Sequence, residues 1–91
     1  MEVNPKLISF TASSKRRIEI LSKFKDKQLS QPEIKKETKM YKSHISRTLK
    51  ELSENKLLKC LNPDDRTFKF YKITSLGMKV LNEVQRIKKL I

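Results

Sequence analysis

The chain has 91 residues, 36% of them hydrophobic and 35% charged, which leaves room for one domain with a modest core. With 22 Lys and Arg against 10 Asp and Glu, its formal net charge is +12, as in proteins that bind polyanions. No apolar run exceeds two residues, so we expect a cytoplasmic protein with no transmembrane helix, signal peptide or membrane partner. A solvated lysine-rich surface is the alternative explanation of the charge, and the distribution of the cations has to decide.

Catalytic and metal-binding patterns are missing from the sequence. Cys60 and His44 are the only residues of their types, so one protomer can form neither a disulfide nor a four-ligand zinc site. Gly77 is the only glycine, which excludes a glycine-rich phosphate loop. We therefore expect no enzyme, no metal and no cofactor. Cys60 follows Lys59 and is compatible with a redox switch, but a lone cysteine is more often a small packed residue.

The first third of the chain predicts an arm and a helix. Residues 1–12 contain Pro5 and a short apolar cluster, and we expect an arm or an extra helical turn rather than a domain. Ser13 or Ser14 can cap a helix over about 14–26, whose apolar residues recur about one turn apart. The domain itself is expected to cover residues 13–91.

Two further helices follow in close succession. The sequence Ser30-Gln31-Pro32-Glu33 is a capping box, and it predicts a short helix that ends near residue 37 or 38. Apolar residues at i, i+4 and i+7 predict the next helix over 42–54, which Asn55 would close in a left-handed conformation. Helices separated by three or four residues cross steeply, which is the helix-turn-helix arrangement.

The last third of the chain changes to a two-residue period. Strands are expected over 57–61 and 67–73, joined by the turn-forming residues 62–66 as a β-hairpin. Thr74 or Ser75 would then cap a final helix over 75–91. The predicted order is three helices, a hairpin and a C-terminal helix, an α+β fold that is mainly α.

The helix over 42–54 is the candidate recognition helix. Basic and polar side chains occupy its first turns and its acids come last, although a helix N-terminus prefers acids by roughly 0.3–1 kcal/mol per charge. The helix over 14–26 repeats this inversion with Lys15, Arg16 and Arg17. Cations that face a DNA backbone would explain both helices, whereas solvated basic faces are the alternative.

Each candidate side chain has an expected role. Arg47 and Lys50 would read guanine edges, Lys42 would anchor a phosphate, and the serines would make adaptable contacts. Arg66, at the tip of the hairpin, would reach the DNA backbone or the adjacent minor groove; the alternative is a polar turn in which this arginine has no role. Asp64 and Asp65 would repel phosphate, unless one of them holds Arg66 in position. The residues expected to contact double-stranded DNA are Lys42, Ser43, His44, Ser46, Arg47, Lys50, Arg66, Lys69 and Arg16, and Lys72 could add a phosphate contact.

The final helix carries an apolar stripe that is long for a domain of this size. Its later part and the apolar cluster near the N-terminus would expose an apolar strip unless a second subunit covers it. We expect a homodimer whose two recognition helices meet half-sites about one DNA turn apart. Its expected contacts are Leu7, Phe10, Val80, Val84, Ile87 and Ile91.

Residues 29–81 resemble a known family. LSQPEIKKETKMYKSHISRTLKELSENKLLKCL and NPDDRTFKFYKITSLGMKVL are similar to the helix-turn-helix and wing of MarR- and ArsR-type transcriptional regulators, especially short archaeal members. The resemblance implies a winged helix-turn-helix fold and sequence-specific DNA binding, with helix 42–54 in the major groove and the wing, about 57–73, on the backbone or minor groove. It places the first five candidates at the major groove and Arg66 near the family's wing arginine.

The sequence also departs from this family. Lys39 and Lys56 stand where the family usually has glycine, and Tyr41 replaces the usual serine N-cap. The chain is shorter than typical MarR proteins and lacks the cysteine clusters of metal-sensing ArsR proteins, so any effector stays open.

Three alternatives remain for the function. A winged helix can serve as a protein–protein module, which would need an apolar exposed helix face, or as a non-specific architectural protein. Single-strand or RNA binding would need exposed aromatic platforms, for which Phe68, Phe70 and Tyr71 are the only cluster.

Overall fold

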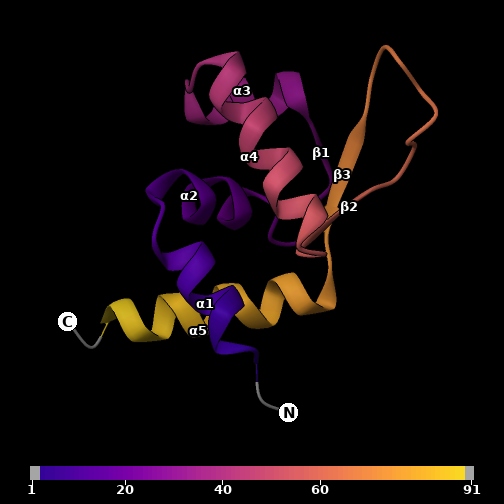
Figure 1. The fold of residues 1–91 in the computed structure, drawn as a ribbon. Coiled ribbons are helices and arrows are strands. Elements are labelled where there is room, and N and C mark those ends of the chain that lie inside the picture. The colour runs from indigo at the N-terminus through magenta and orange to yellow at the C-terminus, as the bar shows by residue number, and fades with distance from the viewer. Residues whose placement is uncertain (1–2, 90–91) are drawn as a thin grey trace.

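In the computed structural model, which describes residues 3–89, five helices pack beside one three-stranded antiparallel sheet, which lies along one side of the molecule (Figure 1). The elements are α1 (Pro5–Ala12), α2 (Lys15–Lys23), β1 (Leu29–Ser30), α3 (Gln31–Thr38), α4 (Lys42–Glu54), β2 (Leu58–Cys60), β3 (Phe70–Ile73) and α5 (Ser75–Lys89). The predicted mainly helical fold, with a helix-turn-helix followed by a hairpin and a C-terminal helix, is confirmed. No helix within residues 3–89 is both long enough and apolar enough to cross a bilayer.

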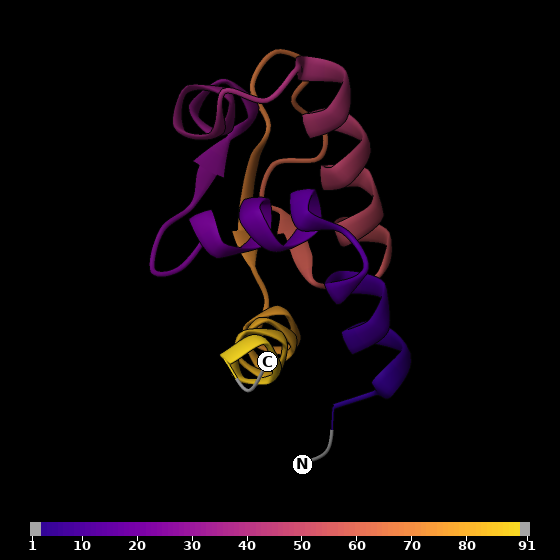
Figure 2. The same cartoon turned by 90° about the vertical axis from the view of Figure 1, so that its left-hand side faces the viewer.

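Helix α1 is more than the expected arm or extra turn. Asn4 caps it, since its side-chain oxygen accepts a hydrogen bond from the amide of Lys6 at 2.9 Å, and Pro5 suits the first turn of a helix. The helix packs against α5, and together they form the end of the molecule opposite α3 (Figure 2). The N-terminal segment is therefore built into the domain.

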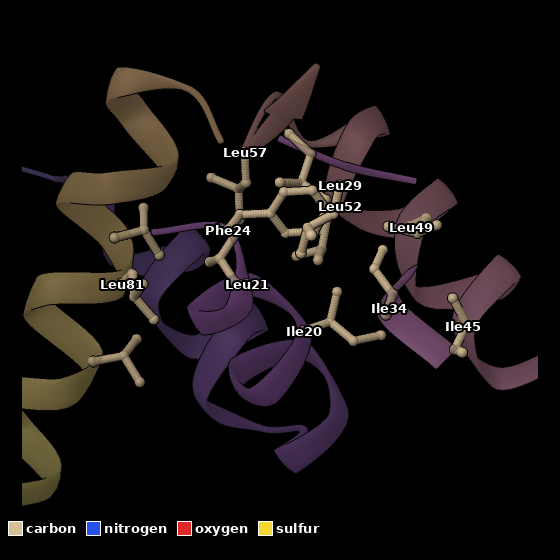
Figure 3. Packing of buried hydrophobic residues seen from close by; sticks show 13 residues of the cluster. Ile20, Leu21, Phe24, Leu29, Ile34, Ile45, Leu49, Leu52, Leu57 and Leu81 are labelled. Atoms are coloured by element: carbon tan, nitrogen blue, oxygen red, sulfur yellow. The ribbon is translucent and has the colours of Figure 1, made fainter. Parts of the chain in front are cut away.

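Helix α2 lies at the centre of the fold, in contact with α1, α3, α4 and α5. Its buried face carries Ile20 and Leu21, and Phe24 follows directly after its last residue (Figure 3). Helices α3, α4 and α5 contribute further apolar residues to the same core. The buried core consists of Ile20, Leu21, Phe24, Leu29, Ile34, Ile45, Leu49, Leu52, Leu57, Leu58, Val80, Leu81 and Val84.

Helix α3 begins with the predicted capping box and is followed after a short turn by α4, as expected of a helix-turn-helix. The Glu33 carboxylate accepts hydrogen bonds from the Ser30 amide at 3.0 Å and from its hydroxyl at 2.9 Å. These bonds lower the pKa of Glu33, the backbone bond contributing most. At the end of α3, Lys39 takes a left-handed conformation with φ 59°. The side chain of Tyr41, at the N-cap of α4, makes no capping bond.

The end of α4 corrects one expectation. Asn55 has φ −91° and is not left-handed, whereas Lys56 is, with φ 64°. The amide of Lys56 donates to the Ser53 carbonyl at 3.0 Å, and that of Leu57 donates to the Leu52 carbonyl at 2.9 Å. This pair of bonds is a Schellman motif, which requires the left-handed residue one position after the cap.

The sheet contains a strand that the sequence did not predict, and its hairpin strands are shorter than expected. β3 lies between β1 and β2 and is antiparallel to both. The expected strand over 67–73 begins only at Phe70, because Asn62 accepts a hydrogen bond from the Phe70 amide at 2.8 Å and donates one to the Phe68 carbonyl at 2.6 Å. These bonds close a loop over residues 61–69, which forms the tip of the wing.

Candidate nucleic-acid interface

Helix α4 has one buried apolar face and one exposed cationic face. Ile45, Leu49 and Leu52 are buried against the core, together with Thr48. The 3.6-residue period then leaves the remaining first-turn positions exposed. Of the predicted contact residues on α4, His44 is half-buried, whereas Lys42, Ser43, Ser46, Arg47 and Lys50 are exposed.

The first turns of α4 are free of acidic partners. No acid lies in the first turn, and Lys42, Arg47 and Lys50 form no ion pair with any residue between 3 and 89. Their positive charge adds to the partial positive charge of the helix N-terminus. This end of α4 therefore presents a concentrated positive field.

Two short-range contacts shape this end of α4. The side-chain amide of Gln31, at the start of α3, donates to the Ser46 hydroxyl at 2.7 Å. That bond ties the two helices of the helix-turn-helix and engages one predicted DNA contact within the chain. The rings of Tyr41 and His44 meet edge to face, with centroids 5.7 Å apart.

The wing extends toward the end of the molecule at which α4 begins (Figures 1 and 2). A hollow of about 420 Å³ separates it from α3 and α4. Four cations from three segments line this hollow, namely Lys35, Lys42, Arg66 and Lys69. The structure thus brings the predicted wing cations and the start of α4 together around one concave surface.

The acids of the wing do not hold Arg66, which corrects one of the alternatives considered above. The Asp65 carboxylate accepts hydrogen bonds from the Thr67 amide and hydroxyl, both at 2.8 Å, and from the Phe68 amide at 3.0 Å. These bonds lower the pKa of Asp65, with the Phe68 amide contributing most. Asp65 therefore shapes the turn, and Arg66 has no ion pair within the described residues.

The aromatic residues do not form the platform that single-strand binding would need. Phe68 is 54% exposed in the wing, whereas Phe70 and Tyr71 are half-buried in β3. Burial is also the main reason that the pKa of Tyr71 is raised. Of these three rings only that of Phe68 is exposed, so the cluster offers a single stacking position.

The cations of α2 divide into two roles. Arg16 is exposed, as a DNA contact requires. Arg17, grouped with it in the sequence, is half-buried and forms an ion pair with Glu51 of α4 at 2.7 Å. This pairing was missed because 34 positions separate the two residues, and no local pattern signals it.

The predicted dimer contacts are only partly available on the surface. Val80 and Val84 are buried in the protomer's own core, and this corrects their assignment to a dimer face. Leu7 and Phe10 are half-buried against that core, and Ile87 is 38% exposed. Ile91 lies outside the described residues.

Within residues 3–89, no group of three or more His, Cys, Asp and Glu side chains could hold a metal ion. Cys60 is half-buried, with Sγ 4.0 Å from the side-chain oxygen of Asn62.

No protein-family model matches the sequence, and no curated protein sequence matches it. Solved structures do match. A MarR variant from E. coli, complexed with operator DNA, has a TM-score of 0.71 at 18% identity, over 89% of this chain and 62% of that one. The transcriptional repressor BigR from Xylella fastidiosa has a TM-score of 0.76 at 16% identity, over 96% of this chain and 85% of that one.

HlyU from Vibrio cholerae matches over nearly its whole length, with a TM-score of 0.71 at 24% identity, covering 99% of this chain and 97% of that one. The chain thus spans less than two thirds of the MarR variant but almost all of HlyU. The likeness that the sequence suggested is confirmed at the level of structure: the chain has the winged-helix fold shared by MarR, BigR and HlyU.

Proposed function

We propose that the chain is a DNA-binding transcriptional regulator that inserts the first turns of α4 into the major groove. The observation that carries this proposal is the exposed end of α4, where Lys42, Arg47 and Lys50 have no acidic partner among the described residues. A surface of this kind suits a phosphate backbone, and an α-helix fits the major groove. The solved MarR structure that shares the fold is complexed with operator DNA.

Each part of the surface has a distinct role in this complex. Arg47 and Lys50 read base edges, while Lys42 and the two serines of the first turns contact phosphates or bases. Arg66 and Lys69 place the wing on the backbone or in the adjacent minor groove. Because the wing and the start of α4 flank one hollow, both can contact the same duplex.

A homodimer completes the proposal. The α1 and α5 layer lies at the end of the molecule opposite α3, so pairing through it leaves both recognition helices free (Figure 2). Among residues 3–89, the predicted contacts that remain at least partly exposed are Leu7, Phe10 and Ile87. Two protomers would then meet half-sites about one helical turn apart.

The rival protein–protein module is disfavoured by the same surface. An apolar partner would need apolar side chains on the exposed face of α4, and those positions carry cations, serines and Glu54. The choice between a sequence-specific regulator and a non-specific architectural protein needs an experiment.

The deciding experiment is a salt-titrated binding assay on duplex DNA. The region upstream of the chain's own gene is compared with a scrambled duplex, for wild type, Arg47→Ala and Lys88→Ala. Lys88 is an exposed cation in the last turn of α5, so its variant controls for the loss of one charge far from α4.

We expect the upstream duplex to bind more tightly, Arg47→Ala to reduce that preference, and Lys88→Ala to leave it unchanged. Log affinity should fall with log salt by about 0.9 for each phosphate neutralised. Equal binding of both duplexes would favour an architectural protein or an operator elsewhere. No binding at low salt would refute DNA binding and favour the protein–protein module.

A further inference from the structure

The flank of α4 that faces α2 carries a second, smaller polar hollow of about 200 Å³. It lies on the opposite side of α4 from the hollow beside the wing, because residues 44, 47, 48 and 51 line it whereas residues 42 and 45 line the other. The lining residues are Ser14, Arg16, Arg17, His44, Arg47, Thr48 and Glu51. Two exposed arginines from different helices therefore border the same small space.

Four contacts hold the side chain of Arg17, one of the residues that line this hollow. Its guanidinium lies 3.9 Å from the centroid of the Phe10 ring. One terminal nitrogen donates to the Phe10 carbonyl at 2.6 Å and to the Ser13 hydroxyl at 3.1 Å, and the other donates to Glu51 at 2.7 Å. The side chain of Arg17 is only 18% exposed, so solvent screens this ion pair less than it would a surface pair.

Glu51 would otherwise oppose an anion at this place. It stands four residues after Arg47 on α4, the spacing at which an acid and a base on one helix face pair with each other. Glu51 instead bonds Arg17, and Arg47 and Arg16 form no ion pair with any residue between 3 and 89. Arg17 thus neutralises the Glu51 carboxylate, while the guanidinium groups of Arg16 and Arg47 form no ion pair within residues 3–89.

We infer that this hollow binds a backbone phosphate of the DNA through Arg16 and His44, and that Arg17 is a positioning residue that makes the site attractive to an anion. The inference rests on the proposed function, since α4 in the major groove brings this flank to the sugar–phosphate backbone. By holding Glu51, Arg17 removes a carboxylate that would repel the phosphate and would draw Arg47 away from the bases.

The test measures affinity and its salt dependence for the upstream and scrambled duplexes by fluorescence anisotropy. The variants are Arg16→Ala, Arg17→Met, Glu51→Gln and the double variant Arg17→Met/Glu51→Gln, with Lys88→Ala as the matched control. Arg16→Ala should weaken binding to both duplexes alike, by roughly ten-fold, and lower the salt slope by about 0.9 for each phosphate that is no longer neutralised. Lys88→Ala should leave the slope unchanged.

Arg17→Met should also weaken binding, because it leaves Glu51 free. The second substitution, Glu51→Gln, should restore affinity to within about two-fold although the ion pair is still missing. A role of Arg17 in stability alone predicts the opposite, since removing both partners would not recover binding. Thermal melts establish which variants are folded.

If Arg17→Met does not fold, Glu51→Gln alone decides, and it should bind at least as tightly as wild type. An unchanged salt slope in Arg16→Ala, a folded double variant that stays weak, or weaker binding by Glu51→Gln would each overturn the inference. These results differ from failure of the proposed function, in which the wild type itself does not bind duplex DNA.

Discussion

Gly77, in the first turn of α5, lies close to the backbone of Leu57. The Thr74 hydroxyl accepts a hydrogen bond from the Gly77 amide at 2.9 Å and donates to the Lys56 carbonyl at 2.7 Å, and the Thr74 amide donates to the Leu57 carbonyl at 3.0 Å. The first turn of α5 therefore lies directly on the backbone at the end of α4. A Cβ at position 77 would stand 2.1 Å from the Leu57 oxygen and 2.7 Å from Ile73 Cγ1.

The substitution Gly77→Ala tests this joint. The Leu57 oxygen would have to move from 2.1 Å to at least 3.0 Å, and backbone atoms cannot rotate away as a side chain can. Overpacking of this kind costs about 1–3 kcal/mol, and the displacement would also weaken hydrogen bonds worth about 1 kcal/mol each. The higher helix propensity of alanine returns up to about 1 kcal/mol. We expect a net loss of about 3 kcal/mol in the free energy of unfolding.

Urea denaturation and thermal melting measure this loss. For a chain of this length, a loss of about 3 kcal/mol corresponds to a fall in Tm of roughly 12–24 °C. Asn82→Ala, at an exposed position of the same helix, is the control and should change stability by less than about 0.5 kcal/mol. If Gly77→Ala changes stability as little as Asn82→Ala, the close approach of α5 to Leu57 does not exist in solution.

Three further predictions concern helix ends. Lys56→Gly should raise the free energy of unfolding by about 0.5–1 kcal/mol, because glycine adopts the left-handed φ of 64° without strain. A lower free energy of unfolding in urea titrations would contradict the Schellman motif. Glu33→Gln should flatten the acid dependence of Tm. The folded pKa of Glu33 is lowered from 4.5, so its contribution is present above that pH and is lost as the pH falls through the folded value; equal slopes in both proteins would refute this. Lys42→Glu should stabilise the N-terminus of α4 by roughly 0.3–1 kcal/mol while DNA binding falls, and tighter binding would contradict the proposed interface.

Periodicity predicted the bounds of α4 well, whereas the helix expected over about 14–26 ends at Lys23. The bounds of α4 agree with the expected 42–54, because its apolar residues repeat over three turns against one continuous core. The capping box likewise marked the start of α3 at the right residue, since its signal lies in adjacent positions. Local patterns of this kind need no knowledge of distant parts of the chain.

Elements that depend on distant partners were predicted less well. β1 has only two residues and exists because Leu29 and Ser30 pair with Tyr71 and Phe70 across the chain. The wing strands are short because Asn62 and Asp65 bond the loop backbone, and their side chains could have been assigned to any polar turn. The burial of Val84, assigned to a dimer face from its helical stripe, depends on how α5 docks.

The helix dipole bears on the proposed interface at α4. Both α2 and α4 begin with cations where the dipole prefers acids, and the sequence alone treats the two helices alike. In α2, Arg17 has an internal partner in Glu51, so part of its unfavourable placement is offset within the protein. In α4, Lys42 and Arg47 have no such partner in the described chain. The uncompensated cations at the start of α4 therefore support the proposal that this helix contacts the DNA.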